Sequence, residues 1–240
     1  EKLHRLGAHG IDLNLGCSAP LLKKQGAGLA LVENYSEMCR VLHSLRKSTE
    51  LPISVKIRLG NQLNSDKLRE FCRLLEDNGV DLITIHARLD GEKFCRKPRW
   101  DAIGKIRRDV SVPILVNGGI FSVEDAQDSL EQSGADGGMV GRGAVERPWL
   151  CGEIAKNIFG IAVPDSQRSG AEIFFKFMSL LEDRFAPERR LGRLKQFTTY
   201  YAAQFTFGHH LAAAIQSSAT IDQAKQRASE FFTQNAQFSN

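Results

Sequence analysis

A cysteine stands just beyond the first predicted strand, in a loop rich in lysine and glycine. The segment IDLNLGCSAPLLKKQGAG runs from Ile11 to Gly28, and Cys17 lies three residues after Asn14. A thiol beside lysine or arginine can give or take a proton near neutral pH. A single cysteine more often packs in a core, so position alone leaves both interpretations of Cys17 open.

Other polar residues close apolar runs further along the chain. His86 ends the run ITIH, and Lys56 and Asn117 each stand four residues after a proline. The carboxyl ends of parallel strands share one edge of the sheet, where active sites of βα folds are built. The residues expected around this common opening are Asn14, Lys56, His86, Asn117 and Gly141.

Two arginines are expected at the same edge, because side chains alternate along a strand. Arg58 shares a face with Lys56, and Arg88 shares a face with His86. Lys56 and His86 together are suited to hold the ring of a phosphate-bearing cofactor. A lysine beside a flavin would stabilise the anionic reduced ring.

Glycine-rich segments follow the last two predicted strands. NGGI begins at Asn117, and GRGA begins at Gly141. Gly118, Gly119 and Gly141 would let backbone N–H groups approach an anion, and Arg142 adds a full positive charge. The two loops are predicted to bind a phosphate, although tight turns alone would also explain their glycines.

The elements that must position these residues follow a βα rhythm. Strands are expected to begin near residues 11, 53, 82, 114 and 138, with starts 24 to 42 residues apart. Helical patterns lie between them, over residues 34–48, 65–79, 100–110 and 122–134. This is the spacing of βα units in a parallel sheet. No GxGxxG motif follows the first strand, so a (β/α)8 TIM barrel fits better than an open sheet. Because eight units close a barrel, the chain is expected to hold about the last five and to begin inside a longer protein.

The strand pattern stops after residue 163, and helical spacing follows. We therefore predict a barrel domain over residues 1–163 and a small helical domain over residues 164–240. His209 and His210 are expected between its helices, where they make a poor metal site. The expected helices of the second domain cover residues 169–185, 189–205 and 218–232.

Composition narrows the class of protein. Five cysteines without a CxxC pair argue against a disulfide framework and a zinc site, and favour the cytoplasm. No apolar run approaches the length of a membrane span. Cys39, Cys72 and Cys151 are expected to pack against apolar neighbours.

Two basic clusters suggest an RNA partner. LDGEKFCRKPRW spans Leu89–Trp100 after the third predicted strand, and PERRLGRLKQF spans Pro187–Phe197 on a helical pattern. Either cluster alone is commonly a solvated surface. Their combination with a net charge of +4 is compatible with a phosphate backbone as partner.

The motifs DLNLGCSAP…GAG, SVKIRLG, ITIHAR, VPILVNGGI and GADGGMVGRGAVERPW together resemble the tRNA-dihydrouridine synthases in order and spacing. The segment around LGRLKQF resembles the family's C-terminal tRNA-binding domain. The resemblance implies an FMN enzyme that reduces the C5=C6 bond of particular tRNA uridines, with NADPH reloading the flavin. It also implies a tRNA partner, no membrane and a monomeric full-length protein, and the target base must leave its stack.

The resemblance implies roles for individual residues. Cys17 would protonate C5 as hydride moves from the flavin to C6, and Asn14 would help position the uracil. Lys56 and His86 would contact the flavin. The residues implied for the FMN phosphate are Asn117, Gly118, Gly119, Gly141 and Arg142.

Arg58 and Arg88 look like residues that line the substrate site. Ser18 and Pro20 stand where the family usually has proline and lysine. Two alternatives stay open: an FMN-barrel oxidoreductase of the dihydroorotate or dihydropyrimidine type that acts on a small molecule, and a non-catalytic RNA-binding relative.

Overall fold

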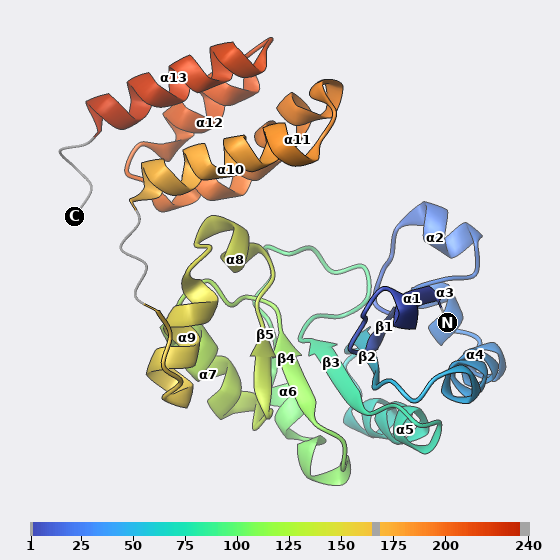
Figure 1. Cartoon of the computed structure of the whole chain (residues 1–240). Helices are drawn as coiled ribbons and strands as arrows, with labels where there is room; N and C mark the ends of the chain where they lie inside the picture. Colours follow the sequence, from blue (N-terminus) through green and yellow to red (C-terminus); the bar gives the residue numbers. More distant parts are fainter. Residues whose placement is uncertain (1, 165–168, 236–240) are drawn as a thin grey trace. The chain divides into compact units, whose positions relative to one another are not determined.

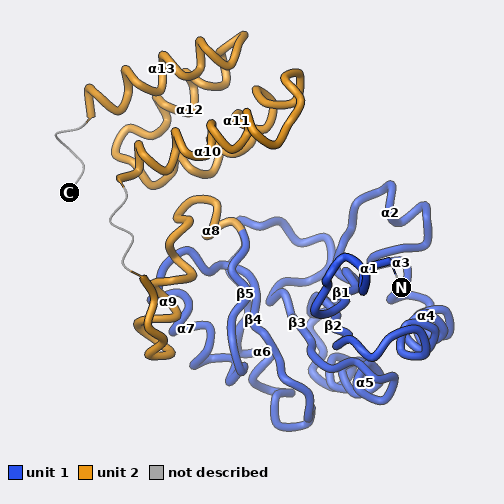
Figure 2. Tube along the Cα trace, viewed as in Figure 1, with its two compact units in different colours: residues 1–141 blue, residues 142–240 orange. Residues whose placement is uncertain are grey.

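The structure is a computed structural model that describes residues 2–164 and 169–235. Residues 165–168 and 236–240 of the predicted helical domain lie outside the described residues. The chain forms two compact units, residues 1–141 and residues 142–240 (Figure 2). The predicted division into a barrel domain over residues 1–163 and a helical domain over residues 164–240 stays a prediction.

The first unit is a parallel sheet with helices between its strands (Figure 1). Its strands are β1 (Ile11–Asn14), β2 (Ile53–Arg58), β3 (Leu82–His86), β4 (Ile114–Asn117) and β5 (Gly137–Met139). Its helices are α1 (Lys2–Arg5), α2 (Pro20–Lys24), α3 (Leu29–Val32), α4 (Tyr35–Ser48), α5 (Ser65–Asp77), α6 (Trp100–Gly104), the 3₁₀ turn η1 (Arg107–Asp109) and α7 (Val123–Ser133).

The strands lie side by side in the order in which they occur in the sequence. The sheet order is β1-β2-β3-β4-β5, and every neighbouring pair is parallel. In a doubly wound sheet the order of the strands reverses at a switch point. The order of the described strands does not reverse. Successive winding is the topology of a βα barrel. The predicted α/β fold, part of a TIM barrel followed by a helical unit, is therefore confirmed.

The core of the first unit lies between one face of the sheet and helices α4, α5 and α6. On β2 the alternate residues Ile53, Val55 and Ile57 are buried, whereas Lys56 and Arg58 are partly exposed on the other face. Period-two alternation therefore separates the residues that pack from those available for chemistry. The helices contribute the buried residues Met38, Leu42, Leu68, Phe71, Leu75 and Ile103 to the same core.

Side-chain caps fix the starts of several helices. Asn34 accepts from the backbone of Glu37 at the start of α4. Ser122 and Asp125 form a reciprocal capping box at the start of α7, with backbone-to-side-chain distances of 3.0 and 3.1 Å. Such caps satisfy backbone N–H groups that the helix leaves unpaired. The strand-to-helix connection after β4 is thereby held in place.

The second unit is helical. It contains α8 (Arg142–Glu146), α9 (Leu150–Phe159), α10 (Gly170–Arg184), α11 (Pro187–Tyr201), the 3₁₀ turn η2 (Ala202–Gln204), α12 (Gly208–Gln216) and α13 (Ile221–Gln234). Phe174, Leu194 and Tyr201 are fully buried within a separate core of α10 to α13. In residues 2–164 and 169–235, no helix combines the length and apolar character needed to cross a bilayer.

Three local expectations were wrong. His209 and His210 lie in the first turn of α12, not between helices. The helix expected over residues 100–110 ends at Gly104 and continues as a 3₁₀ turn. Cys151 is exposed, although Cys72 is buried as expected. Amphipathic spacing predicts a helical segment well, but it does not predict which side a neighbouring element will cover.

Candidate active site

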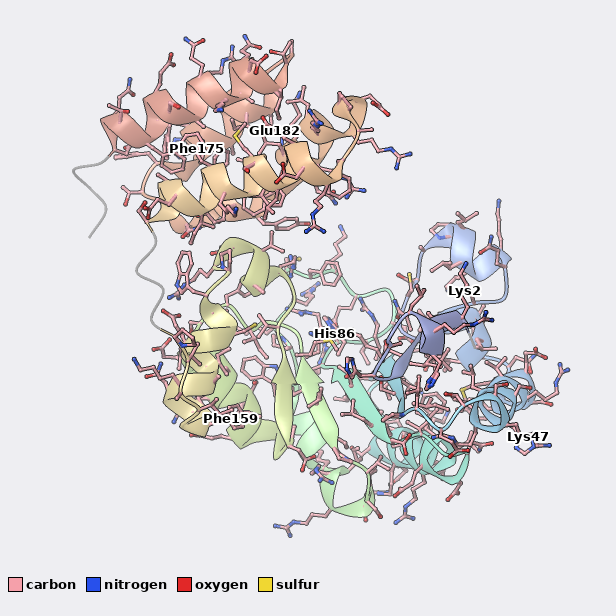
Figure 3. All side chains as sticks on the ribbon, in the orientation of Figure 1. Lys2, Lys47, His86, Phe159, Phe175 and Glu182 are labelled. Carbon is pink, nitrogen blue, oxygen red and sulfur yellow. The ribbon has the colours of Figure 1, made fainter. Side chains whose placement is uncertain are left out.

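His86 is held at the carboxyl end of β3 by buried hydrogen bonds, and Figure 3 labels it there. Its Nδ1 lies 2.7 Å from Oδ1 of Asn117, whose side-chain amide donates to the carbonyl of Met139 at 2.8 Å. Because the Asn117 nitrogen is engaged with Met139, its oxygen faces the imidazole. Nδ1 of His86 is therefore assigned as the donor.

The other ring nitrogen of His86 accepts from an arginine. Nη1 of Arg88 lies 3.3 Å from Nε2 of His86. Burial lowers the pKa of His86 to about 4, and the charges of Lys56, Arg58 and Arg88 act in the same direction, against the hydrogen bond with Asn117. The imidazole is consequently neutral at physiological pH, with its proton on Nδ1.

Lys56 and Asn14 are direct neighbours across β1 and β2. Burial lowers the pKa of Lys56, as does the charge of Arg58, while Asp12 opposes the shift. Oδ1 of Asn14 accepts from the backbone of Gly16 at 3.2 Å. This bond turns the chain at the end of β1 and leads it into the loop that carries the cysteine.

Gly28 packs closely against the backbone of the loop that carries Cys17. The carbonyl of Cys17 accepts from the backbone of Leu29 at 3.1 Å. Gly28 has a φ of +62°, and a Cβ placed on it would lie 2.5 Å from the carbonyl oxygen of Cys17. Only glycine tolerates both this conformation and this approach. Cys17 itself is partly exposed.

The NGG segment after β4 is packed against the same cluster. Gly118 has a φ of +103°, and a Cβ there would lie 3.0 Å from the His86 ring. A Cβ on Gly119, whose φ is +80°, would lie 2.8 Å from the ring of Pro98. The indole of Trp100 donates to the carbonyl of Gly118 at 3.0 Å. These glycines are thus required by protein packing, whether or not a phosphate also binds there.

Gly141 and Arg142 fall at the division between the two units. A Cβ on Gly141 would meet nothing within 4 Å, and Arg142 begins α8. Their part in a phosphate site remains a prediction.

Arg58 and Arg88 both bind the backbone of the loop that follows β3. Arg58 donates to the carbonyl of Leu89 at 2.7 Å, and Nε of Arg88 donates to the carbonyl of Arg96 at 2.6 Å. Arg88 is buried and Arg58 partly so. Their predicted contact with substrate remains a prediction, whereas their contact with this loop is observed.

The strand register places the polar residues of the sheet edge at two heights along the strands, not at the single height expected. Asn14 pairs with Lys56, and His86 pairs with both Arg58 and Asn117. His86 therefore stands two residues further along the sheet than Lys56, roughly 7 Å at the rise of a parallel strand. The side chains share one face and one edge, but they form two steps.

Sequence comparison places this site within a known family. The family model described as Dihydrouridine synthase (Dus) matches residues 1–237. The chain belongs to the dihydrouridine synthase family. Every strand end described above lies within the matched residues.

Several curated dihydrouridine synthases are similar to this chain. A probable tRNA-dihydrouridine synthase of Rhodobacter capsulatus is 38% identical over 72% of this chain and 53% of its own length. A tRNA-dihydrouridine(16) synthase of Haemophilus influenzae is 29% identical over 94% of this chain and 72% of its own length. Probable tRNA-dihydrouridine synthase 1 of Synechocystis is 34% identical over 64% of this chain and 43% of its own length. The chain spans about half the length of most of the relatives it matches.

Sequence reasoning missed three positioning residues in this dihydrouridine synthase family member. Gly28 supports the Cys17 loop, Trp100 anchors the NGG segment, and Glu92 organises the loop after β3. The closing glycine of GAG was visible as a motif, but its close approach to Cys17 was not. Glu92 was hidden among lysines and arginines, where a lone carboxylate has no evident partner in sequence.

Proposed function

We propose that the whole protein to which this chain belongs reduces the C5=C6 bond of a uridine in tRNA to 5,6-dihydrouridine, with FMN as cofactor and NADPH as reductant. Family membership over residues 1–237 carries this proposal. The parallel-sheet edge supports it, because it presents Asn14, Lys56 and His86 on one face beside the Cys17 loop.

The residues present fit a flavin. Lys56 stands on the face of the sheet away from the helices, where a cation favours the anionic reduced ring. His86 is neutral and rigidly oriented, so it supplies a flat, fixed wall without adding a charge. The flavin, when bound, supplies the hydride that is delivered to C6 of the uridine.

Cys17 is proposed to supply the proton that balances this hydride. Protonation at C5 with hydride addition at C6 adds two hydrogens across the double bond, and NADPH is oxidised to NADP⁺ overall. The Cys17 thiolate left behind is reprotonated from solvent, because the side chain is partly exposed. Asn14 is proposed to position the uracil through its side-chain amide.

The test uses the full-length protein with FMN, NADPH and unmodified tRNA, followed by mass spectrometry of the nucleosides. The wild type should add two hydrogens to a particular uridine. Cys17→Ala should lose at least about 100-fold in rate, the usual scale of general acid catalysis, while it retains tRNA binding. Cys151→Ala, the same change at an exposed cysteine, is the control and should leave the rate unchanged.

The alternatives give different results. A small-molecule oxidoreductase would turn over free pyrimidines and leave tRNA unmodified. A non-catalytic RNA-binding relative would bind tRNA without adding hydrogens, and equal rates for Cys17→Ala and wild type would refute the role of the thiol.

A further inference from the structure

The loop between β3 and α6, residues 89–99, is held by an internal ion pair. Both carboxylate oxygens of Glu92 accept from Arg99, at 2.7 and 3.0 Å, and one also accepts from the backbone of Leu89 at 3.0 Å. The Glu92 side chain is only 15% exposed. A two-pronged arginine–carboxylate pair fixes orientation as well as distance. Glu92 therefore joins the beginning of the loop to its end.

Two further arginines, Arg58 on β2 and Arg88 just after β3, anchor the same loop. Arg58 on β2 binds the carbonyl of Leu89, and Arg88 binds the carbonyl of Arg96. Together with Arg99, three guanidinium groups thus hold the loop in one conformation. An eleven-residue loop would otherwise lose this shape, because ordering it costs conformational entropy.

The loop held by these contacts carries a set of exposed cations. Lys93, Arg96 and Lys97 are exposed, and no carboxylate among residues 2–164 and 169–235 forms an ion pair with any of them. The nearest acidic side chain in the loop, Glu92, is engaged by Arg99. An open hollow of about 850 Å³ is lined by Glu92, Lys93, Arg96, Lys97, Pro98 and Arg99.

This surface borders the proposed active site. The Phe94 side chain is 53% exposed, and its ring lies 5.9 Å from that of His86. The guanidinium of Arg58 lies over the Phe94 ring, 5.7 Å from its centroid. An exposed aromatic face among cations is the combination that binds single-stranded nucleic acid, with bases stacking and phosphates paired.

We propose that residues 89–99 form a preorganised RNA-binding surface in the sheet unit, in which Lys93, Arg96 and Lys97 contact backbone phosphates beside the target nucleotide. Glu92 is a positioning residue for these cations. The inference rests on the proposed function for its choice of tRNA. An extended row of cations suits a polyanion better than a single small phosphate.

The test measures the affinity of the full-length protein for unmodified tRNA at several salt concentrations. Each phosphate contact that is lost should lower the slope of log affinity against log salt by about one. The double variant Lys93→Ala/Lys97→Ala should therefore lower the slope by about two. The matched control, Lys47→Ala/Arg108→Ala, removes the same charge from exposed positions before β2 and β4, and Lys47 lies well away from His86 (Figure 3).

The control should keep the wild-type slope. An unchanged slope in the loop variant, or an equal decrease in the control, would overturn the proposal. These are binding measurements, so they remain decisive even if the wild type forms no dihydrouridine. Failure of the proposed function and failure of the loop assignment are thus separate results.

Glu92→Gln distinguishes positioning from simple charge. Removing a negative charge should strengthen RNA binding if only net charge matters. If Glu92 positions the loop, the loss of its pair with Arg99 should weaken binding by several-fold. Tighter or unchanged binding would refute the positioning role, and circular dichroism verifies that the variant is folded.

Discussion

The carboxyl edge of the sheet and the helical unit hold their polar groups in different ways. At the sheet edge, His86 is fixed by Asn117 on one side and Arg88 on the other, and the loop after β3 is tied by further side chains. In the helical unit, α11 carries a basic cluster on a backbone that hydrogen-bonds to itself. A strand end or loop needs side-chain partners to hold its geometry, whereas a helix does not.

The aromatic core of the helical unit strengthens this contrast. Phe197 stacks on Phe177 and on Tyr201, at ring distances of 3.8 and 4.6 Å. The hydroxyl of Tyr201 donates to the carbonyl of Gly170 at 2.7 Å. Stability there comes mainly from apolar burial. At the sheet edge, polar contacts hold the geometry of the candidate site.

The largest effect is expected where backbone and active site meet. Gly28→Ala should destabilise the protein by roughly 3 kcal/mol, because it combines an unfavourable φ with a clash against backbone. Gly26→Ala is the matched control, since Gly26 has a φ of +68° with nothing within 4 Å. It should cost only roughly 1 kcal/mol. Urea denaturation measures both.

The difference between the two variants measures the approach to the Cys17 carbonyl together with the ψ of −129° at Gly28, which lies outside the left-handed helical region. Dihydrouridine formation should fall in Gly28→Ala by more than its folded fraction explains, because the loop carrying the thiol is displaced. Equal stabilities for the two variants would show that Gly28 matters only for its positive φ.

An effect of comparable size is expected from pH. The folded pKa of His86, about 4, lies below its ordinary value of 6.5, so the neutral ring is favoured by folding. This contribution is fully present above about pH 6.5 and is lost as pH falls toward 4. The slope of the free energy of unfolding against pH approaches about 1.4 kcal/mol per pH unit at its steepest. His86→Gln should flatten the measured free energy of unfolding over this range, and an unaltered slope would contradict the buried neutral state.

The smallest effect is expected on α11. Arg190 donates to the carbonyls of Phe185 and Glu182 at 2.8 Å each, whereas Arg189 is exposed. Arg190→Ala should lower the free energy of unfolding by about 1 kcal/mol, and Arg189→Ala should leave it unchanged. Thermal or urea melts of the pair measure the difference. Identical melts would mean that the helical unit gains nothing from its arginine side chains, and the contrast with the sheet edge would be sharper.

Much of the fold was predictable because local signals agreed. The strand starts predicted near residues 11, 53, 82, 114 and 138 lie within one residue of those observed. The capping residues Ser122 and Asp125 likewise acted as their types suggest. Helix α12 was missed because it is short: its segment GHHLAAAIQ has 9 residues, whereas α10 and α11 have 15 each. Gly104, where α6 ends, packs closely on the carbonyl of Gln132 in α7, and no local pattern contains this contact.

The sequence by itself determined the parallel βα order, the helical second unit and the set of polar residues at the strand ends. These follow from periodicity and backbone chemistry, which act between near neighbours in the chain. Only the tertiary structure decided that His86 stands two residues beyond Lys56, that Gly28 supports Cys17, and that Arg58 and Arg88 hold the loop after β3. Register, close approach and hydrogen-bond direction depend on which distant segments meet, and that is set by the packing of the whole sheet.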